Sequence, residues 1–185
     1  MKYALALVAG ISLAACTTET MEIKGAEVTR STVGIDFASM PVGTQAHYKN
    51  SKGDTWVERY VGQKGRFFVM ENVFEGQVTR TMLYNADGTL YRREYADGNV
   101  RTFAPKRCLR VLGDCSFRVT NTKPERQTSS SVGNLVQAGS WFTYTYGPAD
   151  GSRSNVFKYQ LGEFNLIARG QSGDYKERLV KVVKP

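Results

Sequence analysis

Apolar and polar residues alternate over short runs from Val42 onward, and turn residues separate each run from the next. In the run 55–61, for example, Trp56, Glu58 and Tyr60 fall on one face, and the residues between them fall on the other. The runs recur about every ten residues, which is typical of an antiparallel meander. No segment carries the apolar stripe, with a period of about 3.6 residues, that marks an amphipathic helix.

These runs predict strands at residues 42–49, 55–61, 66–74, 77–84, 89–95, 140–146, 153–160, 164–168 and 175–183, and a hairpin at 107–120. Asp-Gly pairs at 87–88 and 97–98 tolerate the positive φ angles that tight hairpins need, so we expect turns there. The sequence therefore predicts an all-β fold. An antiparallel meander of about ten strands forms a barrel, a half-barrel or two packed β-modules.

The β-rich domain is expected to cover residues 41–185. Residues 121–134 interrupt its pattern with Pro124, a Ser-rich run and Gly133, which are typical of a surface loop. One interpretation divides the domain into two halves, 41–120 and 135–185, joined by this loop.

The first sixteen residues are built like a bacterial export signal. Lys2 provides a positive charge, residues 3–15 carry no charge, and Leu13-Ala14-Ala15-Cys16 ends the segment. The apolar stretch is too short for a membrane-spanning helix, which needs about 20 apolar residues. The motif at 13–16 resembles the lipobox of bacterial lipoproteins.

This resemblance implies that residues 1–15 are a signal peptide and that Cys16 is lipidated through its sulfur, often with a further acyl chain on the new amino terminus. Residues 16–40 are then a lipidated tether, and the membrane is a partner through the lipid anchor. Two or more acyl chains make such an anchor stable. Thr17, which stands where an Asp would retain enteric-type lipoproteins in the inner membrane, favours the outer membrane. The alternative is an ordinary secretory signal cleaved near Ala15.

Two cysteines follow Cys16 in the chain, Cys108 and Cys115, and their short separation predicts a local disulfide in an exported protein. A zinc site is the alternative, but His47 is the sole histidine and leaves too few soft ligands. Redox catalysis usually needs a Cys-x-x-Cys pair, which is absent. We therefore expect no metal and no cofactor.

The formal net charge of +8 is spread unevenly, and nine basic residues lie between Arg92 and Arg126 against four acidic ones. A basic region attracts anionic partners, and outside the cytoplasm these are anionic lipid, lipopolysaccharide, a cell-wall polymer or an envelope protein rather than nucleic acid. The alternative is a solvated strand face that protects a sheet edge from aggregation. The residues expected to bind an anionic partner are Arg92, Arg93, Arg101, Lys106, Arg107 and Arg110.

Aromatic residues occur in nearly every predicted strand. If the sheet curls, one aromatic face points inward and forms either a solid core or a pocket for an apolar ligand. The residues expected to line such a pocket are Trp56, Tyr60, Trp141 and Tyr144.

Catalytic signatures are sparse. A serine triad would need His47 as its base, and no Gly-x-Ser-x-Gly motif is present.

We assign no catalytic residue and expect a non-enzymatic, lipid-anchored envelope protein that acts by binding, in an interaction or scaffold role. The alternative is a carrier of a lipid or other apolar ligand, which would need a cavity of some hundreds of Å³. A cell-envelope hydrolase is the third option, and it would need two carboxylates that converge in a cleft.

Overall fold

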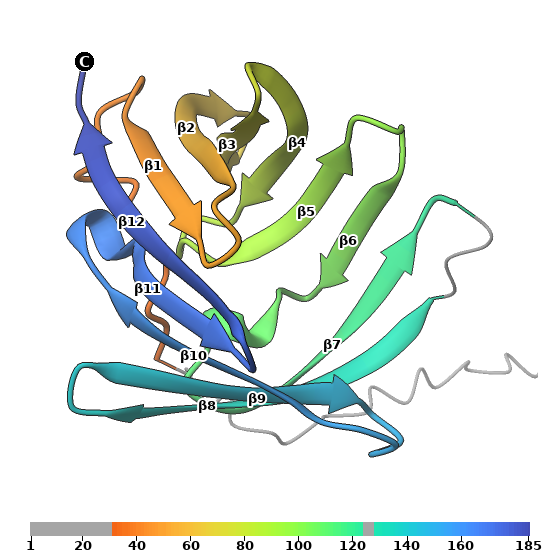
Figure 1. Ribbon diagram of the computed structural model, residues 1–185. Coiled ribbons are helices and arrows are strands. Elements are labelled where there is room, and N and C mark those ends of the chain that lie inside the picture. The colour runs from red at the N-terminus through yellow and green to blue at the C-terminus, as the bar shows by residue number, and fades with distance from the viewer. Residues whose placement is uncertain (1–30, 124–127) are drawn as a thin grey trace, which may run out of the picture.

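Twelve antiparallel strands follow one another in chain order around a closed barrel, and β12 pairs with β1 to complete the ring (Figure 1). The computed structural model describes residues 31–123 and 128–185. The strands are β1 (Gln45–Asn50), β2 (Thr55–Lys64), β3 (Phe67–Phe74), β4 (Gln77–Tyr84), β5 (Leu90–Tyr95), β6 (Val100–Ala104), β7 (Gly113–Asn121), β8 (Ser129–Ala138), β9 (Trp141–Pro148), β10 (Asn155–Leu161), β11 (Ile167–Ser172) and β12 (Tyr175–Val183). Two short 3-10 helices, η1 (Cys108–Arg110) and η2 (Glu163–Asn165), lie between strands. The all-β prediction is confirmed, and the meander forms the barrel.

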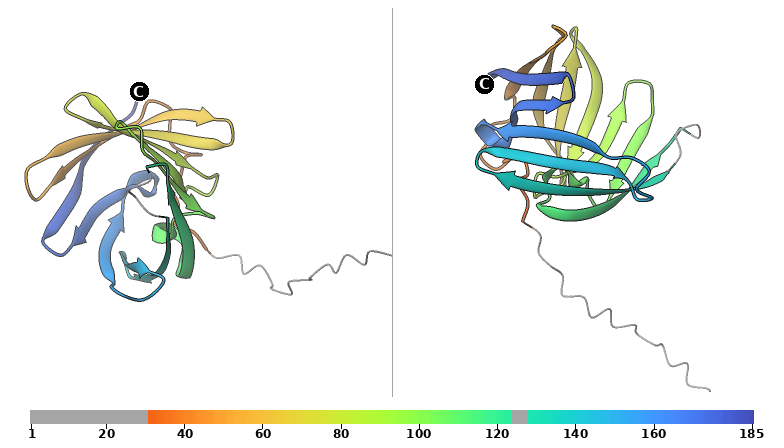
Figure 2. Two further views of the ribbon diagram at one scale, coloured as in Figure 1. Left: turned by 90° about the vertical axis from the view of Figure 1, so that its right-hand side faces the viewer. Right: turned by 60° about the horizontal axis from the view of Figure 1, so that its bottom comes forward.

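Closure joins the two ends of the β-rich domain. Gln45 at the start of β1 pairs with Val183 at the end of β12, so the sheet has no free edge. Strand bending is assisted by bulges, such as the one between Tyr60 and Gly62, where Val61 is left over in the register with β3. The left view of Figure 2 shows the strands arranged as a ring.

The prediction of a hairpin at 107–120 is wrong, although the predicted disulfide is confirmed. Cys108 begins η1, Cys115 lies on β7, and the two Cα atoms are 5.7 Å apart. A single strand, β7, covers most of the run and pairs with β6 and β8. The local sequence resembled a hairpin because both cysteines sit among β-forming residues, but the covalent bond joins a helical turn to a strand.

Strand β8 occupies much of the segment where the sequence indicated a loop. Residues 129–134 pair with β7 on one side, and from Ser131 onward β8 also pairs with β9. The Ser-rich run forms this strand because ladder hydrogen bonds come from the backbone, and neighbours on both sides outweigh the weak β propensity of serine and glycine. Both expected halves of the domain therefore contribute to one barrel.

The signal-peptide and lipobox predictions, at residues 1–16, lie outside the described residues.

Residues 31–40 pack across one end of the barrel, which we call the closed end, together with η1, η2 and the turn between β4 and β5. The backbone N–H of Val33 donates to Arg110, that of Ile35 to Gly88 and that of Asp36 to Phe164. Phe37 is buried and stacks on Phe68 with ring centroids 4.7 Å apart. This part of the expected tether is thus integrated into the core.

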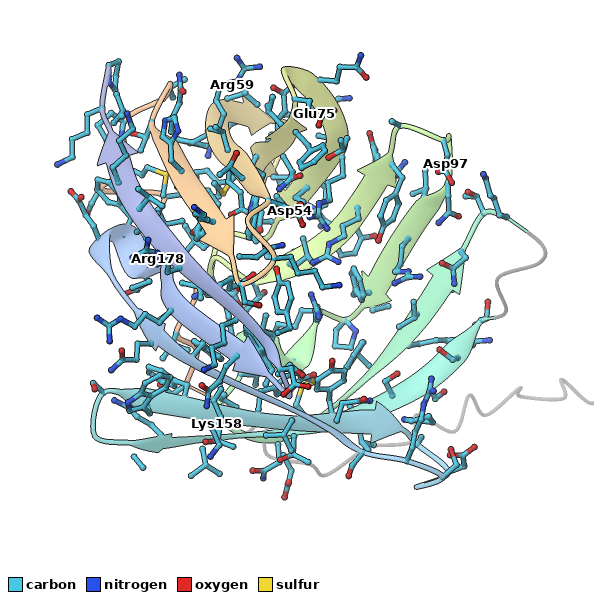
Figure 3. The ribbon with its side chains drawn as sticks, in the orientation of Figure 1. Asp54, Arg59, Glu75, Asp97, Lys158 and Arg178 are labelled. Atoms are coloured by element: carbon cyan, nitrogen blue, oxygen red, sulfur yellow. A yellow bond between two sulfur atoms is a disulfide. The ribbon has the colours of Figure 1, made fainter. Side chains whose placement is uncertain are left out.

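The other end of the barrel carries the hairpin turns β1–β2, β3–β4, β5–β6, β9–β10 and β11–β12, and we call it the open end. Figure 3 shows Asp54, Glu75 and Asp97 at three of these turns. Across the part of the chain that the structure describes, no helix is long and apolar enough to cross a membrane.

Candidate functional site

The barrel contains a cavity of about 550 Å³, a volume within the usual range for small-molecule sites. Ile35 and Leu166 line it near the closed end, and Asn50, Asp54 and Tyr175 line it near the open end. Its walls combine apolar and aromatic side chains with seven charged ones. The charged residues are Asp54, Glu58, Arg80, Arg93, Arg107, Arg110 and Glu177.

Arg110 links the segments that form the floor of the cavity, which is its wall at the closed end of the barrel. The residue is only 6% exposed, and its Nη1 donates to the carbonyl oxygens of Val33, at 2.8 Å, and Asn165, at 2.9 Å. The hydroxyl of Tyr159 donates to the carbonyl oxygen of Leu109 at 2.7 Å, which fixes η1 against β10. Arg110, which the sequence suggested for an anionic partner, therefore connects the N-terminal segment, η1 and η2.

Of the three carboxylates that line the cavity, two lie on strands, Glu58 on β2 and Glu177 on β12. Glu58 on β2 lies beside Asn72 on β3, which in turn lies beside Arg80 on β4. Burial raises the pKa of Glu58, and Arg80 and Arg93 oppose that rise. Burial likewise raises the pKa of Glu177 on β12, whose carboxylate accepts a hydrogen bond from the Tyr175 hydroxyl at 3.1 Å.

Three further arginines line the cavity without a direct carboxylate partner. Among the described residues, neither Arg80, Arg93 nor Arg107 forms an ion pair. The Nε–H groups of Arg80 and Arg93 are buried and donate to no atom of the described residues. Burial, assisted by the like charge of Arg93, lowers the pKa of Arg107 to about 10, so its guanidinium remains charged at neutral pH.

Tyr144 on β9 presents a buried hydroxyl to the cavity. The residue is 1% exposed, and its hydroxyl oxygen has no hydrogen-bond partner in residues 31–123 or 128–185. The ring lies over β8 because Gly133 leaves room for it: a Cβ at that position would be 2.6 Å from Cε2 of the tyrosine. Burial raises the pKa of Tyr144 to about 12, while Arg107 opposes the shift, so the hydroxyl is a donor at neutral pH.

The six basic residues expected to bind an anionic partner do not share one face. Arg93 and Arg107 line the cavity, whereas Arg92 points outward from β5, because neighbouring residues of a strand face opposite sides, and its Nε lies 3.0 Å from Glu94. Lys106 forms an ion pair with Asp87. The Nε of Arg101 donates to Asn121 at 3.1 Å.

The four aromatic residues expected in a pocket also separate. Trp56 and Tyr144 line the cavity, and Trp56 stacks on Tyr48 with ring centroids 5.3 Å apart. Tyr60 is buried against Phe37 at the closed end. Trp141 does not line the cavity.

Two charged residues that line the cavity, Arg80 and Glu177, were not singled out from the sequence, and Glu58 was considered only as one of several carboxylates. A signal existed for Glu58, since alternation places it on the face of Trp56 and Tyr60. Within residues 31–123 and 128–185, no three His, Cys, Asp or Glu side chains gather where they could hold a metal ion.

Comparisons of the chain with protein-family models, with curated proteins and with solved structures find no significant match.

Proposed function

We propose that this protein acts by binding, and that the barrel interior takes up a small amphipathic ligand. The observation that supports this proposal is the cavity of about 550 Å³, whose lining is partly apolar and partly charged. Met82, Leu90 and Phe157 offer apolar surface, and the interior arginines and carboxylates offer polar contacts. A ligand with both kinds of group matches such walls better than a pure hydrocarbon.

The cavity favours the carrier role over the interaction or scaffold role. A scaffold acts through its outer surface and gains nothing from an interior space, while unfilled space forfeits packing contacts. The outer surface supports a separate proposal: Arg101 and Lys106, which do not line the cavity, can attract anionic lipid, lipopolysaccharide or cell-wall polymer.

The proposed location follows from the lipobox resemblance at residues 13–16. A lipid on Cys16 would anchor the protein in the bacterial envelope, with the outer membrane favoured by Thr17. Fourteen residues, 17–30, lie between the anchor and the first described residue of the barrel. In this arrangement the cavity would be held close to a membrane surface, where amphipathic ligands are abundant.

A first test is native mass spectrometry of the Cys16→Ser protein purified from a bacterial periplasm. A co-purifying mass of lipid size supports the carrier role.

A second test uses the two tryptophans, because Trp56 lines the cavity and Trp141 does not. The probes are 11-bromoundecanol and 11-bromoundecanoic acid, whose bromine quenches indole fluorescence on contact.

The proposal expects at least one probe to quench Trp56 in the Trp141→Phe variant and to leave Trp141 unquenched in the Trp56→Phe variant. Equal quenching of both tryptophans, or of neither, together with an apo mass spectrum, would refute uptake into the barrel.

A second candidate function rests on Glu58 and Glu177. Both carboxylates line the same cavity, burial raises the pKa of each, and the charge of Glu58 raises the pKa of Glu177 further. Paired carboxylates with shifted pKa values are the machinery of acid-base hydrolysis. This candidate predicts that Glu58→Gln or Glu177→Gln abolishes turnover of an envelope glycan. Activity that survives both substitutions, or no turnover by the native protein, removes it.

A further inference from the structure

The interior charges of the barrel do not balance locally. Arg110 is committed to two backbone carbonyls, and Arg80 lies near both Glu58 and Glu177. Arg107 differs from these, since the charged group that acts on it is another cation, Arg93. Its remaining neighbours include the tyrosines Tyr84, Tyr144 and Tyr146. Glu58 thus interacts with Arg93, whereas the groups that act most strongly on Arg107 are Arg93 and three tyrosines.

An unpaired buried cation is unfavourable, because a charge withdrawn from water needs a partner of opposite sign or several hydrogen bonds. Within residues 31–123 and 128–185, Arg107 forms no ion pair, and its guanidinium lies over the Phe103 ring at 5.8 Å, a weaker partner than an acid. The Tyr144 hydroxyl is a second, independent sign of an absent partner, because it is almost fully buried, faces the same cavity and donates to nothing described. The Nε–H of Arg93 and this hydroxyl are thus buried donors without an acceptor in the described residues, and the Arg107 guanidinium lines the same cavity.

We propose that the ligand carries an acidic group, a carboxylate or a phosphate, and that Arg93, Arg107 and Tyr144 hold it inside the barrel. This inference rests on the proposed function and specifies its ligand class. A carboxylate or phosphate accepts several hydrogen bonds and suits the planar donors of arginine. The apolar walls at Met82, Leu109 and Phe157 remain available for the rest of the molecule.

The charge of Glu58 should lower the affinity of the cavity for an acidic ligand. As an interior carboxylate near Arg93, it competes electrostatically with an incoming acid for the same positive charge. Loss of its charge should strengthen binding of an acid, whereas loss of an arginine charge should weaken it. A purely apolar ligand would respond to neither change.

The experiment measures quenching of Trp56 in the Trp141→Phe background at neutral pH, with 11-bromoundecanoic acid and 11-bromoundecanol titrated below their micelle concentrations. The two probes differ only in the acidic group. We expect the acid to bind about tenfold or more tightly than the alcohol. Arg93→Gln and Arg107→Gln should each remove most of this preference, and Glu58→Gln should increase it.

Arg92→Gln is the matched control, since this neighbour of Arg93 lies on the outer face of β5 and pairs with Glu94. It should leave both affinities unchanged. Arg107→Lys keeps the positive charge and should lose less affinity for the acid than Arg107→Gln. Comparison of melting temperatures identifies any variant that fails to fold, and the other arginine then carries the test.

Tyr144→Phe separates a ligand contact from a structural role. Removal of an unpartnered buried hydroxyl should leave stability equal or higher, while affinity for the acid falls and affinity for the alcohol does not. Displacement of the bound bromo-acid by dodecanoate and by dodecyl phosphate then shows which acid is preferred, with dodecanol as the neutral competitor. Equal affinity for acid and alcohol refutes this inference and leaves uptake into the barrel standing. Binding of neither probe, together with an apo mass spectrum, refutes the proposed function itself.

Discussion

Gly34 and Gly88 pass each other in backbone contact at the closed end of the barrel. A Cβ at Gly34 would lie 1.7 Å from the carbonyl oxygen of Asp87, and a Cβ at Gly88 would lie 2.2 Å from the carbonyl oxygen of Ile35. The Ile35 N–H donates to the Gly88 carbonyl at 3.2 Å. The N-terminal segment can therefore approach the β4–β5 turn only because both positions lack a side chain.

Gly34→Ala should destabilise the barrel by about 2 kcal/mol or more, because the obstructing atom belongs to the backbone and cannot rotate away. The substitution should displace residues 31–37 from the closed end and uncover the floor of the cavity. Chemical denaturation measures the loss of stability. Ser39→Ala, an exposed position in the same segment, is the control and should change the free energy of unfolding by less than about 0.5 kcal/mol. Equal stability of the two variants would contradict the close packing.

Removal of the disulfide should lower stability without unfolding the barrel. The chain-entropy model gives about 2.5 kcal/mol for a loop as short as the one between Cys108 and Cys115. The double substitution to serine should also loosen η1, whose Leu109 carbonyl and Arg110 side chain form part of the floor. Calorimetry with and without reductant tests this. A melting temperature of the native protein that ignores reduction would show that the bond contributes no stability.

Much of the fold could be predicted because hairpins are local. Asp87-Gly88 and Asp97-Gly98 lie in turns, as their positive-φ tolerance indicated. Closure could not be predicted, because the pairing of Gln45 with Val183 depends on the summed twist and bending of the strands between them. Strand β8 was missed for a related reason: its Ser-rich start is extended by its neighbours and not by its own side chains.

The candidate site was only partly predictable. The basic region was treated as one patch, although alternation along β5 alone separates Arg92 from Arg93. Alternation assigns each side chain to one of the two faces of a strand, but it does not tell which face lies inside a closed barrel. The sequence therefore did not predict an arginine in the interior. Arg107 lies before η1 and outside any strand, so no period could assign its direction.

Cys16→Ser should release the protein from membranes into the soluble fraction, because the lipid that the resemblance implies could no longer be attached. Fractionation of cells followed by immunoblotting measures the change, and labelling with radioactive palmitate should be lost at the same time. Cys108→Ser, which alters another cysteine, should leave membrane attachment intact. Membrane association that persists in the Cys16→Ser protein would contradict the lipobox interpretation.

Glu58→Gln should stabilise the barrel at neutral pH and not at acid pH. Burial raises the pKa of Glu58 in the folded protein above its ordinary value of 4.5. The folded state therefore binds this proton more tightly than the unfolded state does, and the associated stability is fully present below that value and is lost as pH rises through the raised pKa. Glutamine has no proton to lose, so the melting temperature of the variant should exceed that of the native protein by about 2–4 °C at neutral pH. The difference should shrink as pH falls toward 4.5.

Glu71→Gln, which breaks a partly exposed ion pair with Arg59, serves as the control and should show no such gain. A Glu58→Gln variant that is less stable than the native protein at neutral pH would mean that attraction to the interior arginines outweighs burial, and the charge balance inferred for the cavity would then be wrong.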